Sequence, residues 1–262
     1  MTDFPHTHGK RWPSWVKPRL AFHGAPVGIL MLDRMPGPGL RPYLPGDCGN
    51  ATTWSVPVRY KTVFGLNNTC IFGPNDEKMT ATVVEAATEL VREGARSITA
   101  GCGYFIRYQE AVRAAVDVPV FLSSLLLAPF LEQVLPRSQS LGVIVASKTA
   151  LSQDMVEAAG IRPGIRDRMV IRGLDDAAVF AGKFLEPNGD LDPEALEADV
   201  VDAILRLQKE RPDLGMLLLE CGGLPPYAVA VQEATSLPVF DFTSMVEFFI
   251  GGLTRKRFTG LL

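Results

Sequence analysis

The sequence is poor in the residues that most often build metal and disulfide sites. It has 3 histidines and 4 cysteines in 262 residues. His6, His8 and His23 all lie in the first 23 residues, and the cysteines form no Cys-x-x-Cys pair. These absences argue against a zinc ribbon, a thioredoxin-type motif and a Cys–His nucleophile pair in the body of the chain. We therefore expect no metal centre.

Other signals are missing as well. A net charge of −3 and no basic cluster with interleaved aromatic residues argue against nucleic acid or an anionic membrane as a partner. The longest apolar runs, such as 122–127, are too short to span a bilayer. No phosphate loop or dinucleotide fingerprint is present, so we expect no nucleotide cofactor. Residues 1–19 lack the apolar core of a signal peptide, which favours the cytoplasm, where thiols stay reduced.

What the sequence does contain is an internal repeat centred on two cysteines. A shift of 119 residues aligns Cys102 with Cys221, together with the glycine that follows each one. The same shift aligns Tyr108 with Tyr227, and it aligns the two Pro-Val-Phe segments that begin at Pro119 and Pro238. A shared register without gaps predicts two related halves, each presenting one cysteine at the same kind of turn.

Apolar segments alternate with amphipathic ones along both halves. We predict strands at 27–32, 58–63, 68–71, 97–100, 118–122, 141–146, 168–172, 216–219 and 238–242. We predict helices at 79–92, 104–116, 150–159, 193–210 and 225–235. The continuously apolar strands are typical of parallel sheets that are covered on both faces.

The expected fold class is α/β, with two flavodoxin-like parallel-sheet domains. We expect an N-terminal arm at 1–23, a first domain at 24–123 plus 244–262, and a second domain at 124–243. The helices that follow Ser124 and Ser244 should cross between the domains, because each repeat ends there. The long Gly- and Pro-rich loop at 33–57 is either a binding loop or a run of capped turns. Its candidate substrate contacts are Asp33 and Asn50.

The two cysteines are the candidate catalytic residues. In parallel α/β sheets, ligands bind beyond the carboxyl ends of the strands, which is where Cys102 and Cys221 fall. A helix N-terminus after each cysteine should lower the thiol pKa. If a pseudo-twofold relates the halves, the two thiols face each other across one cleft. One could then remove the α-proton of a small acid, and the other could deliver a proton to the opposite face.

Such a reaction needs donors that stabilise the developing enolate. The backbone N–H groups of the two cysteine turns and the hydroxyl groups at neighbouring strand ends could serve. The candidates are Gly103, Tyr104, Gly222, Gly223, Ser123, Ser124, Thr243 and Ser244. Cys48 and Cys70 have no counterpart in the repeat, so we interpret them as buried packing residues. Glu220 is an unassigned charge that would raise the thiol pKa of Cys221 if it is buried.

Several motifs resemble the aspartate/glutamate/hydantoin racemase superfamily over residues 24–250. They are Gly-Cys-Gly-Tyr-Phe at 101–105, Pro-Val-Phe-Leu-Ser-Ser at 119–124, Leu-Glu-Cys-Gly-Gly-Leu-Pro-Pro-Tyr-Ala at 219–228 and Leu-Pro-Val-Phe-Asp at 237–241. The resemblance implies two domains related by a pseudo-dyad and an active site between them. It also implies racemisation without a cofactor by Cys102 and Cys221, and a homo-oligomer such as a dimer.

The sequence departs from the amino-acid racemases of that superfamily. These follow the first cysteine with Asn-Thr and the second with Thr, whereas here Gly103-Tyr104 and Gly222-Gly223 stand in those places. We expect a racemase or isomerase of a small carboxylic acid, an amino acid or a hydantoin-like cyclic amide. The alternatives are a thiol-dependent decarboxylase of the arylmalonate type, a maleate-type cis–trans isomerase and, outside enzymes, a ligand-binding protein without turnover.

Overall fold

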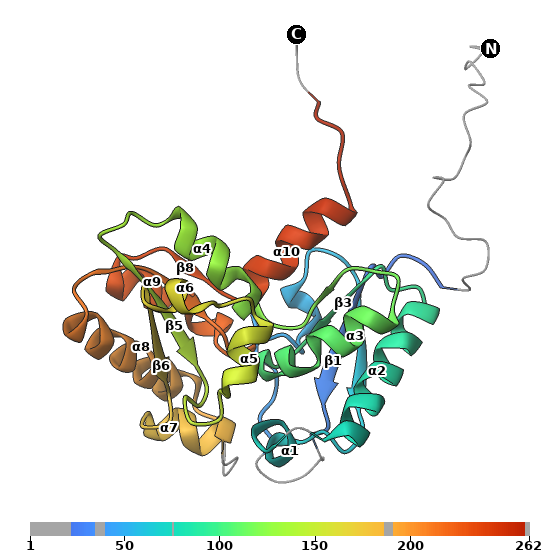
Figure 1. Ribbon diagram of the computed structural model, residues 1–262, viewed down its shortest axis with the longest axis horizontal. Helices are drawn as coiled ribbons and strands as arrows, with labels where there is room; N and C mark the ends of the chain where they lie inside the picture. The colour runs from blue at the N-terminus through green and yellow to red at the C-terminus, as the bar shows by residue number, and fades with distance from the viewer. Residues whose placement is uncertain (1–21, 35–39, 75, 186–190, 260–262) are drawn as a thin grey trace.

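Two parallel sheets of four strands each form the framework of the protein. The computed structural model describes residues 22–34, 40–74, 76–185 and 191–259. The first sheet has the order β2-β1-β3-β4, formed by Val58–Val63, Val27–Leu32, Ser97–Ala100 and Val120–Phe121. The second has the order β6-β5-β7-β8, formed by Met169–Gly173, Ser140–Val145, Leu214–Leu219 and Val239–Phe240. The equivalent orders confirm the predicted α/β fold of two related halves (Figure 1).

Helices cover both sheets. In the first half they are α1 Asn68–Phe72, α2 Glu77–Arg92 and α3 Gln109–Ala115. The rest are α4 Ala128–Val134, α5 Gln153–Ala158, α6 Pro163–Arg166, α7 Ala178–Phe180, α8 Pro193–Glu210, α9 Ala228–Thr235 and α10 Phe242–Leu253. Short 3-10 segments occur at Ala51–Thr53, Gly103–Tyr108, Ser124–Leu127 and Pro225–Tyr227, and a π-helical turn at Ala181–Leu185.

The core follows from the apolar pattern. Every residue of β5 is buried, as expected for a central strand covered on both faces. In α8 the buried residues recur every three or four positions, at Leu196, Val200, Ala203, Ile204 and Leu207. The helix begins where the Asp192 side chain accepts a hydrogen bond from the Ala195 N–H at 3.1 Å, as its sequence predicts.

Two helices lie against the half opposite to the strand that precedes them. α4 packs on β5 through residues that include Ala128 and Leu131. α10 places Phe242, Met245, Val246 and Ile250 in one buried cluster with Val27, Ile29 and Phe121 of the first sheet. In Figure 1, α4 lies over the half that contains β5, and α10 extends toward the half that contains β1. The domain boundaries at 123/124 and 243/244 stay predictions, and nearly all of the predicted arm, 1–23, lies outside the described residues.

Three predicted elements differ from the observed ones. The strand at 68–71 is wrong: α1 forms there, because the Asn67 side chain accepts a hydrogen bond from the Cys70 N–H at 3.1 Å and caps a helical turn. The predicted helix at 104–116 is a 3-10 segment as far as Tyr108, and only then becomes α3. The predicted strand at 238–242 ends at Phe240, because the Asp241 side chain accepts from the Ser244 N–H at 3.0 Å and begins α10.

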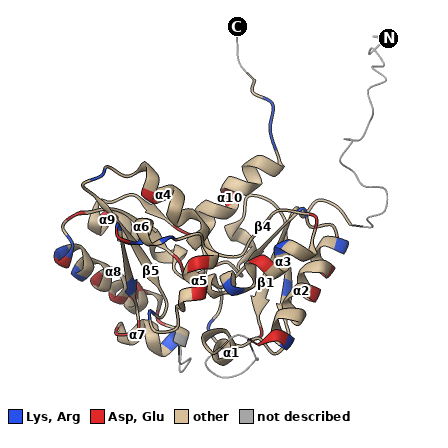
Figure 2. Ribbon diagram, in the orientation of Figure 1, with Lys and Arg blue, Asp and Glu red and all other residues tan. Residues whose placement is uncertain are grey.

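Acidic and basic residues are mixed on the outer helices. Figure 2 shows residues of both signs on α2 and α8. None of the helices in the described ranges is both long enough and apolar enough to cross a membrane.

Candidate active site

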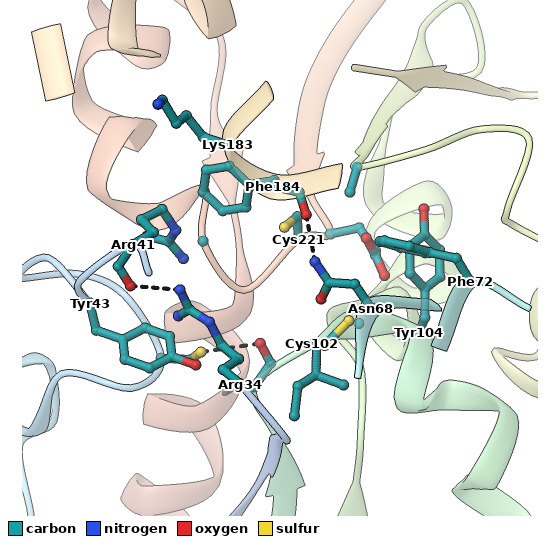
Figure 3. Close-up of a pocket in the computed structure, with 17 residues that line it drawn as sticks. Arg34, Arg41, Tyr43, Asn68, Phe72, Cys102, Tyr104, Lys183, Phe184 and Cys221 are labelled. Atoms are coloured by element: carbon teal, nitrogen blue, oxygen red, sulfur yellow. Dashed lines mark hydrogen bonds between the residues drawn. The ribbon is translucent and has the colours of Figure 1, made fainter. Parts of the chain in front are cut away.

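The two cysteine turns meet at one cavity between the halves. Cys102 follows β3 and Cys221 follows β7, so each lies just beyond the carboxyl end of an inner strand. Both line a cavity of about 70 Å³. Figure 3 shows the two thiols on either side of Asn68, with Arg34 and Arg41 to one side and Phe72 and Tyr104 to the other. The cavity therefore suits a small ligand.

The two turns pack directly against each other. A β-carbon at Gly222 would lie 2.5 Å from the carbonyl oxygen of Gly101, so only glycine allows this approach. Cys48 joins both turns: its thiol donates a hydrogen bond to the Gly101 carbonyl at 3.1 Å, and its backbone N–H donates to the Gly222 carbonyl at 3.3 Å. Cys48 is thus the buried residue that the sequence predicts, and it also lines the cavity.

Burial sets the ionisation of the two thiols. It raises the pKa of Cys221 to about 12, and Glu220 adds to the shift, whereas the Gly223 backbone and the Arg41 cation oppose it. Burial and Glu220 also raise the pKa of Cys102 well above its usual value, opposed by the Tyr104 backbone. The expectation of lowered thiol pKa values is wrong, because desolvation outweighs the backbone donors. The Arg41 cation is among the main influences on the pKa of Cys221 and is not among those on the pKa of Cys102.

One wall of the cavity is basic. Arg41 forms a bidentate ion pair with the buried Asp47, with Nη1–Oδ2 at 2.8 Å and Nη2–Oδ1 at 3.2 Å. Its guanidinium carbon lies 4.1 Å from the ring centroid of Phe184. Arg34 donates a hydrogen bond to the Arg41 carbonyl at 2.6 Å and lies over the ring of Tyr43 at 4.7 Å. Within the described part of the chain, no carboxylate forms an ion pair with Arg34, so it can receive one from a ligand.

The opposite wall is acidic and aromatic. Glu220 is 1% exposed, and neither of its carboxyl oxygens has a hydrogen-bond partner among the described residues. Burial raises its pKa to about 8. The rings of Phe72 and Tyr104 meet edge to face at 5.4 Å. The Tyr104 hydroxyl is fixed by donating to the Ser147 carbonyl at 2.6 Å and accepting from the Ser147 N–H at 2.9 Å.

Asn68 connects the two halves at the cavity. Its side-chain amide donates a hydrogen bond to the carbonyl oxygen of Phe184 at 3.0 Å. Asn68 opens α1, whereas Phe184 lies in the π-helical turn of the other half. In Figure 3 this amide lies between Cys102 and Cys221. The contact holds the Phe184 segment over the cavity.

The structure brings some of the predicted site residues together. Gly103, Tyr104 and Gly223 line the cavity together with Cys102 and Cys221. Gly222 supports the cavity through its close contact with the Gly101 carbonyl.

The other predicted contacts are not among the residues that line the cavity, and their side chains have partners within the chain. The Ser123 side chain caps a 3-10 segment, and the Ser124 hydroxyl donates to the Leu219 and Glu220 carbonyls, each at 3.3 Å. The remaining four also have partners within the chain. Ser244 donates to Asp241 at 3.2 Å. Thr243 donates to Asp241 at 2.7 Å, Asp33 accepts from the Gly65 N–H at 2.8 Å, and Asn50 donates to the Tyr43 carbonyl at 3.0 Å.

The sequence reasoning missed several residues that line the cavity. They are Arg34, Arg41, Tyr43, Asn68, Phe72, Lys183 and Phe184. A usable signal existed for two of them, because Arg34 follows β1 closely and Asn68 lies beyond the end of β2, at the same sheet edge as Cys102. That edge is where parallel sheets bind ligands.

Comparison with known proteins gives relatives over nearly the whole chain. The chain is 31% identical over 250 residues to a dimethylsulfoniopropionate lyase of Durusdinium sp. clade D, covering 90% of this chain and 78% of the relative. It is 29% identical to dimethylsulfoniopropionate lyase 7 of Emiliania huxleyi, covering 87% of this chain and 67% of the relative. No family model matches the sequence.

Solved structures share the fold. Glutamate racemase from Bacillus anthracis matches with a TM-score of 0.57 and 15% identity, over 88% of this chain and 82% of that one. Allantoin racemase from Klebsiella pneumoniae matches with a TM-score of 0.56 and 14% identity, over 89% of this chain and 96% of that one. A variant of arylmalonate decarboxylase matches with a TM-score of 0.52 and 17% identity, over 87% of this chain and 92% of that one.

The chain shares the two-sheet fold of these racemases and of arylmalonate decarboxylase, as the resemblance in the sequence implies. By sequence, the chain belongs to the dimethylsulfoniopropionate lyase family. The expectation of a racemase or isomerase is therefore wrong, because the relatives that match most of the chain are lyases. The alternative of a thiol-dependent decarboxylase, itself a lyase reaction, agrees better with these relatives.

Proposed function

We propose that this protein is a lyase that cleaves dimethylsulfoniopropionate or a closely similar β-sulfonio carboxylate into a neutral thioether and an unsaturated acid. The observation that carries the proposal is the position of Cys221, a thiol beside the Arg41 cation, in a small cavity with a basic wall. The relatives in the family support the choice of substrate.

The basic wall supplies the carboxylate site. Arg34 has its guanidinium in the cavity without a carboxylate partner among the described residues, and Arg41 is held rigid by Asp47. A guanidinium binds a carboxylate through charge-assisted hydrogen bonds in a fixed geometry. Binding there withdraws charge from the acid and makes the hydrogens on its α-carbon more acidic. The wall therefore both orients the substrate and favours its deprotonation.

Cys221 is the base of the proposed reaction. As a thiolate it takes the α-proton, the electrons of that C–H bond form the carbon–carbon double bond, and the bond from the β-carbon to sulfur breaks. The sulfur leaves with that electron pair as neutral dimethyl sulfide, and acrylate remains. Cys221 is left as a thiol, which returns its proton to solvent. Because the leaving group is neutral, it needs no proton from a general acid.

The fixed Arg41 cation favours Cys221 over Cys102 as the base. A nearby positive charge lowers a thiol pKa, and Arg41 acts in this direction on Cys221, whereas it is not among the main influences on the pKa of Cys102. Two matched thiols suit racemisation, but elimination needs only one of them to act as a base. The second thiol then completes the shape and polarity of the cavity.

The test is production of dimethyl sulfide from dimethylsulfoniopropionate, measured by gas chromatography, with acrylate followed by proton NMR. The wild-type protein should form both products in equal amounts. Cys221→Ser should lower the rate about 1,000-fold, because a hydroxyl is too weakly acidic to act as the base. Cys70→Ser is the matched control, since Cys70 does not line the cavity. No dimethyl sulfide from the wild-type protein would overturn the proposal.

A further inference from the structure

Glu220 presents a carboxyl group whose position needs an explanation. It lines the cavity, is 1% exposed, and has no hydrogen-bond partner for either oxygen among the described residues. A buried polar group without a partner costs free energy, and a buried carboxylate costs more. The proposed deprotonation does not use Glu220. Its carboxylate even opposes that step, because it raises the pKa of both cysteines.

The fold makes room for this carboxyl group. A β-carbon at Gly103 would overlap Oε1 of Glu220, so the glycine after Cys102 leaves the space that the carboxyl group occupies. The cations on the other wall do not neutralise it: within the described ranges, Glu220 forms no ion pair. The carboxyl group is thus buried, unpaired and directed at the cavity.

Aromatic rings stand beside it. Tyr104 follows Gly103 directly, and Glu220 acts electrostatically on the Tyr104 hydroxyl. Phe72 packs on Tyr104 edge to face, and both rings line the cavity. Aromatic faces attract cations that carry methyl groups, and a cation beside Glu220 favours the ionised form of its carboxyl group, which carries the opposite charge. In Figure 3, Phe72 and Tyr104 lie on the far side of the cysteines from Arg34 and Arg41.

We infer that Glu220, Phe72 and Tyr104 form a cation subsite that receives the dimethylsulfonio group of the substrate, opposite the carboxylate site at Arg34 and Arg41. This inference rests on the proposed function and names the residues that select a sulfonium substrate. The cavity then holds a zwitterion by both ends, with the α- and β-carbons between them, near Cys221. A ligand that has a carboxylate but no cationic group can bind only to the basic wall.

The experiment measures binding without turnover, in Cys221→Ser protein, by isothermal titration calorimetry. The probes are dimethylsulfoniopropionate and 4-methylpentanoate, in which a neutral CH replaces the sulfonium sulfur. The Cys221→Ser protein should bind dimethylsulfoniopropionate at least about tenfold more tightly. Adding Glu220→Gln should remove this preference and leave the affinity for 4-methylpentanoate within about twofold. An unchanged preference would overturn the inference.

A further variant and a further measurement distinguish failure of the cation subsite from failure of the proposed reaction. Phe72→Leu keeps apolar volume but removes a ring, so it should also reduce the preference, and it carries the test if Glu220→Gln does not fold. Gas chromatography on the wild-type protein tests the function separately. Preference without dimethyl sulfide formation would leave the subsite standing and remove the proposed reaction. Dimethyl sulfide formation with a preference that Glu220→Gln and Phe72→Leu leave unchanged would remove the subsite alone.

Discussion

The carboxyl group of Glu220 lies against the α-carbon of Gly103, in the space that a β-carbon at that position would occupy. The second cysteine turn shows the same relation, because a β-carbon at Gly223 would overlap the ring of Phe184. The contact at Gly103 explains why the Asn of the amino-acid racemases is absent after Cys102. The Thr is absent after Cys221 because a β-carbon at Gly222 would lie 2.5 Å from the Gly101 carbonyl oxygen. Side chains at Gly103 and Gly223 would displace the acidic carboxyl group and the aromatic ring under Arg41.

Gly103→Ala tests this contact. The new methyl group forces the Glu220 carboxyl group to move, so we expect a loss of about 1–3 kcal/mol in the free energy of unfolding, measured by urea denaturation. In a Glu220→Ala background the same substitution should cost much less, because the overlapping group is gone. Gly164→Ala is the control, since a β-carbon there meets no atom within 4 Å. Equal costs in both backgrounds would show that Glu220 is not the obstacle.

Cys102→Ser should separate the two thiols. We expect it to lower kcat for dimethyl sulfide release only about tenfold, because Cys102 shapes the cavity but does not remove the proton. Cys48→Ser should change kcat less, since a hydroxyl can keep the hydrogen bond to the Gly101 carbonyl. Initial rates measured by gas chromatography decide between these outcomes. A loss as large as that of Cys221→Ser would assign the base role to both thiols.

Arg34→Met removes the unpaired cation of the basic wall. We expect KM for dimethylsulfoniopropionate to rise about tenfold, and the affinity for 4-methylpentanoate to fall by a similar factor, because both carry a carboxylate. Arg113→Met is the control, since Arg113 pairs with Glu110 on the surface. Arg41 is less suitable, because its loss would leave the buried Asp47 without its partner. Unchanged affinities in the Arg34 variant would place the carboxylate elsewhere.

Glu220 should also make stability depend on pH. Burial raises its pKa from 4.5 to about 8, so the folded protein binds a proton more tightly than the unfolded chain does. The contribution of Glu220 to stability is therefore fully present below pH 4.5 and is lost as the pH rises toward 8, by roughly 1 kcal/mol for each unit. Glu220→Gln lacks this dependence. Urea unfolding from pH 5 to 8 should show that the free energy of unfolding of the variant increases relative to that of the wild-type protein. Parallel pH profiles of the two proteins would contradict this.

The strands were predictable because burial on both faces gives a continuously apolar sequence. Val27–Leu32 and Ser140–Val145 are apolar on both faces, which only a covered parallel strand requires. The repeat then placed both cysteines at equivalent turns. The helix at Asn68–Phe72 was not predictable from its apolar residues, because a single side chain, that of Asn67, starts it.

The site residues were predictable only where they directly follow the end of a strand. Cys102 and Cys221 meet that condition, whereas Arg41 and Phe184 reach the cavity from a long loop and from a π-helical turn. Hydroxyl groups at strand ends misled the prediction, because that of Ser124 is used by the chain itself. The predicted reaction was also wrong, because two equivalent cysteine turns do not require the two thiols to have equivalent roles in catalysis.

The opposite ends of the cavity have a stereochemical consequence. Dimethylsulfoniopropionate is achiral, but the two hydrogens on its α-carbon are enantiotopic. A substrate held at Arg34 by its carboxylate and at Glu220 by its sulfonium group cannot rotate in the cavity, so its two α-hydrogens cannot exchange places. Only one of the two then faces Cys221, so substrate labelled with deuterium in one configuration loses the label to water. Its mirror image carries the deuterium into acrylate.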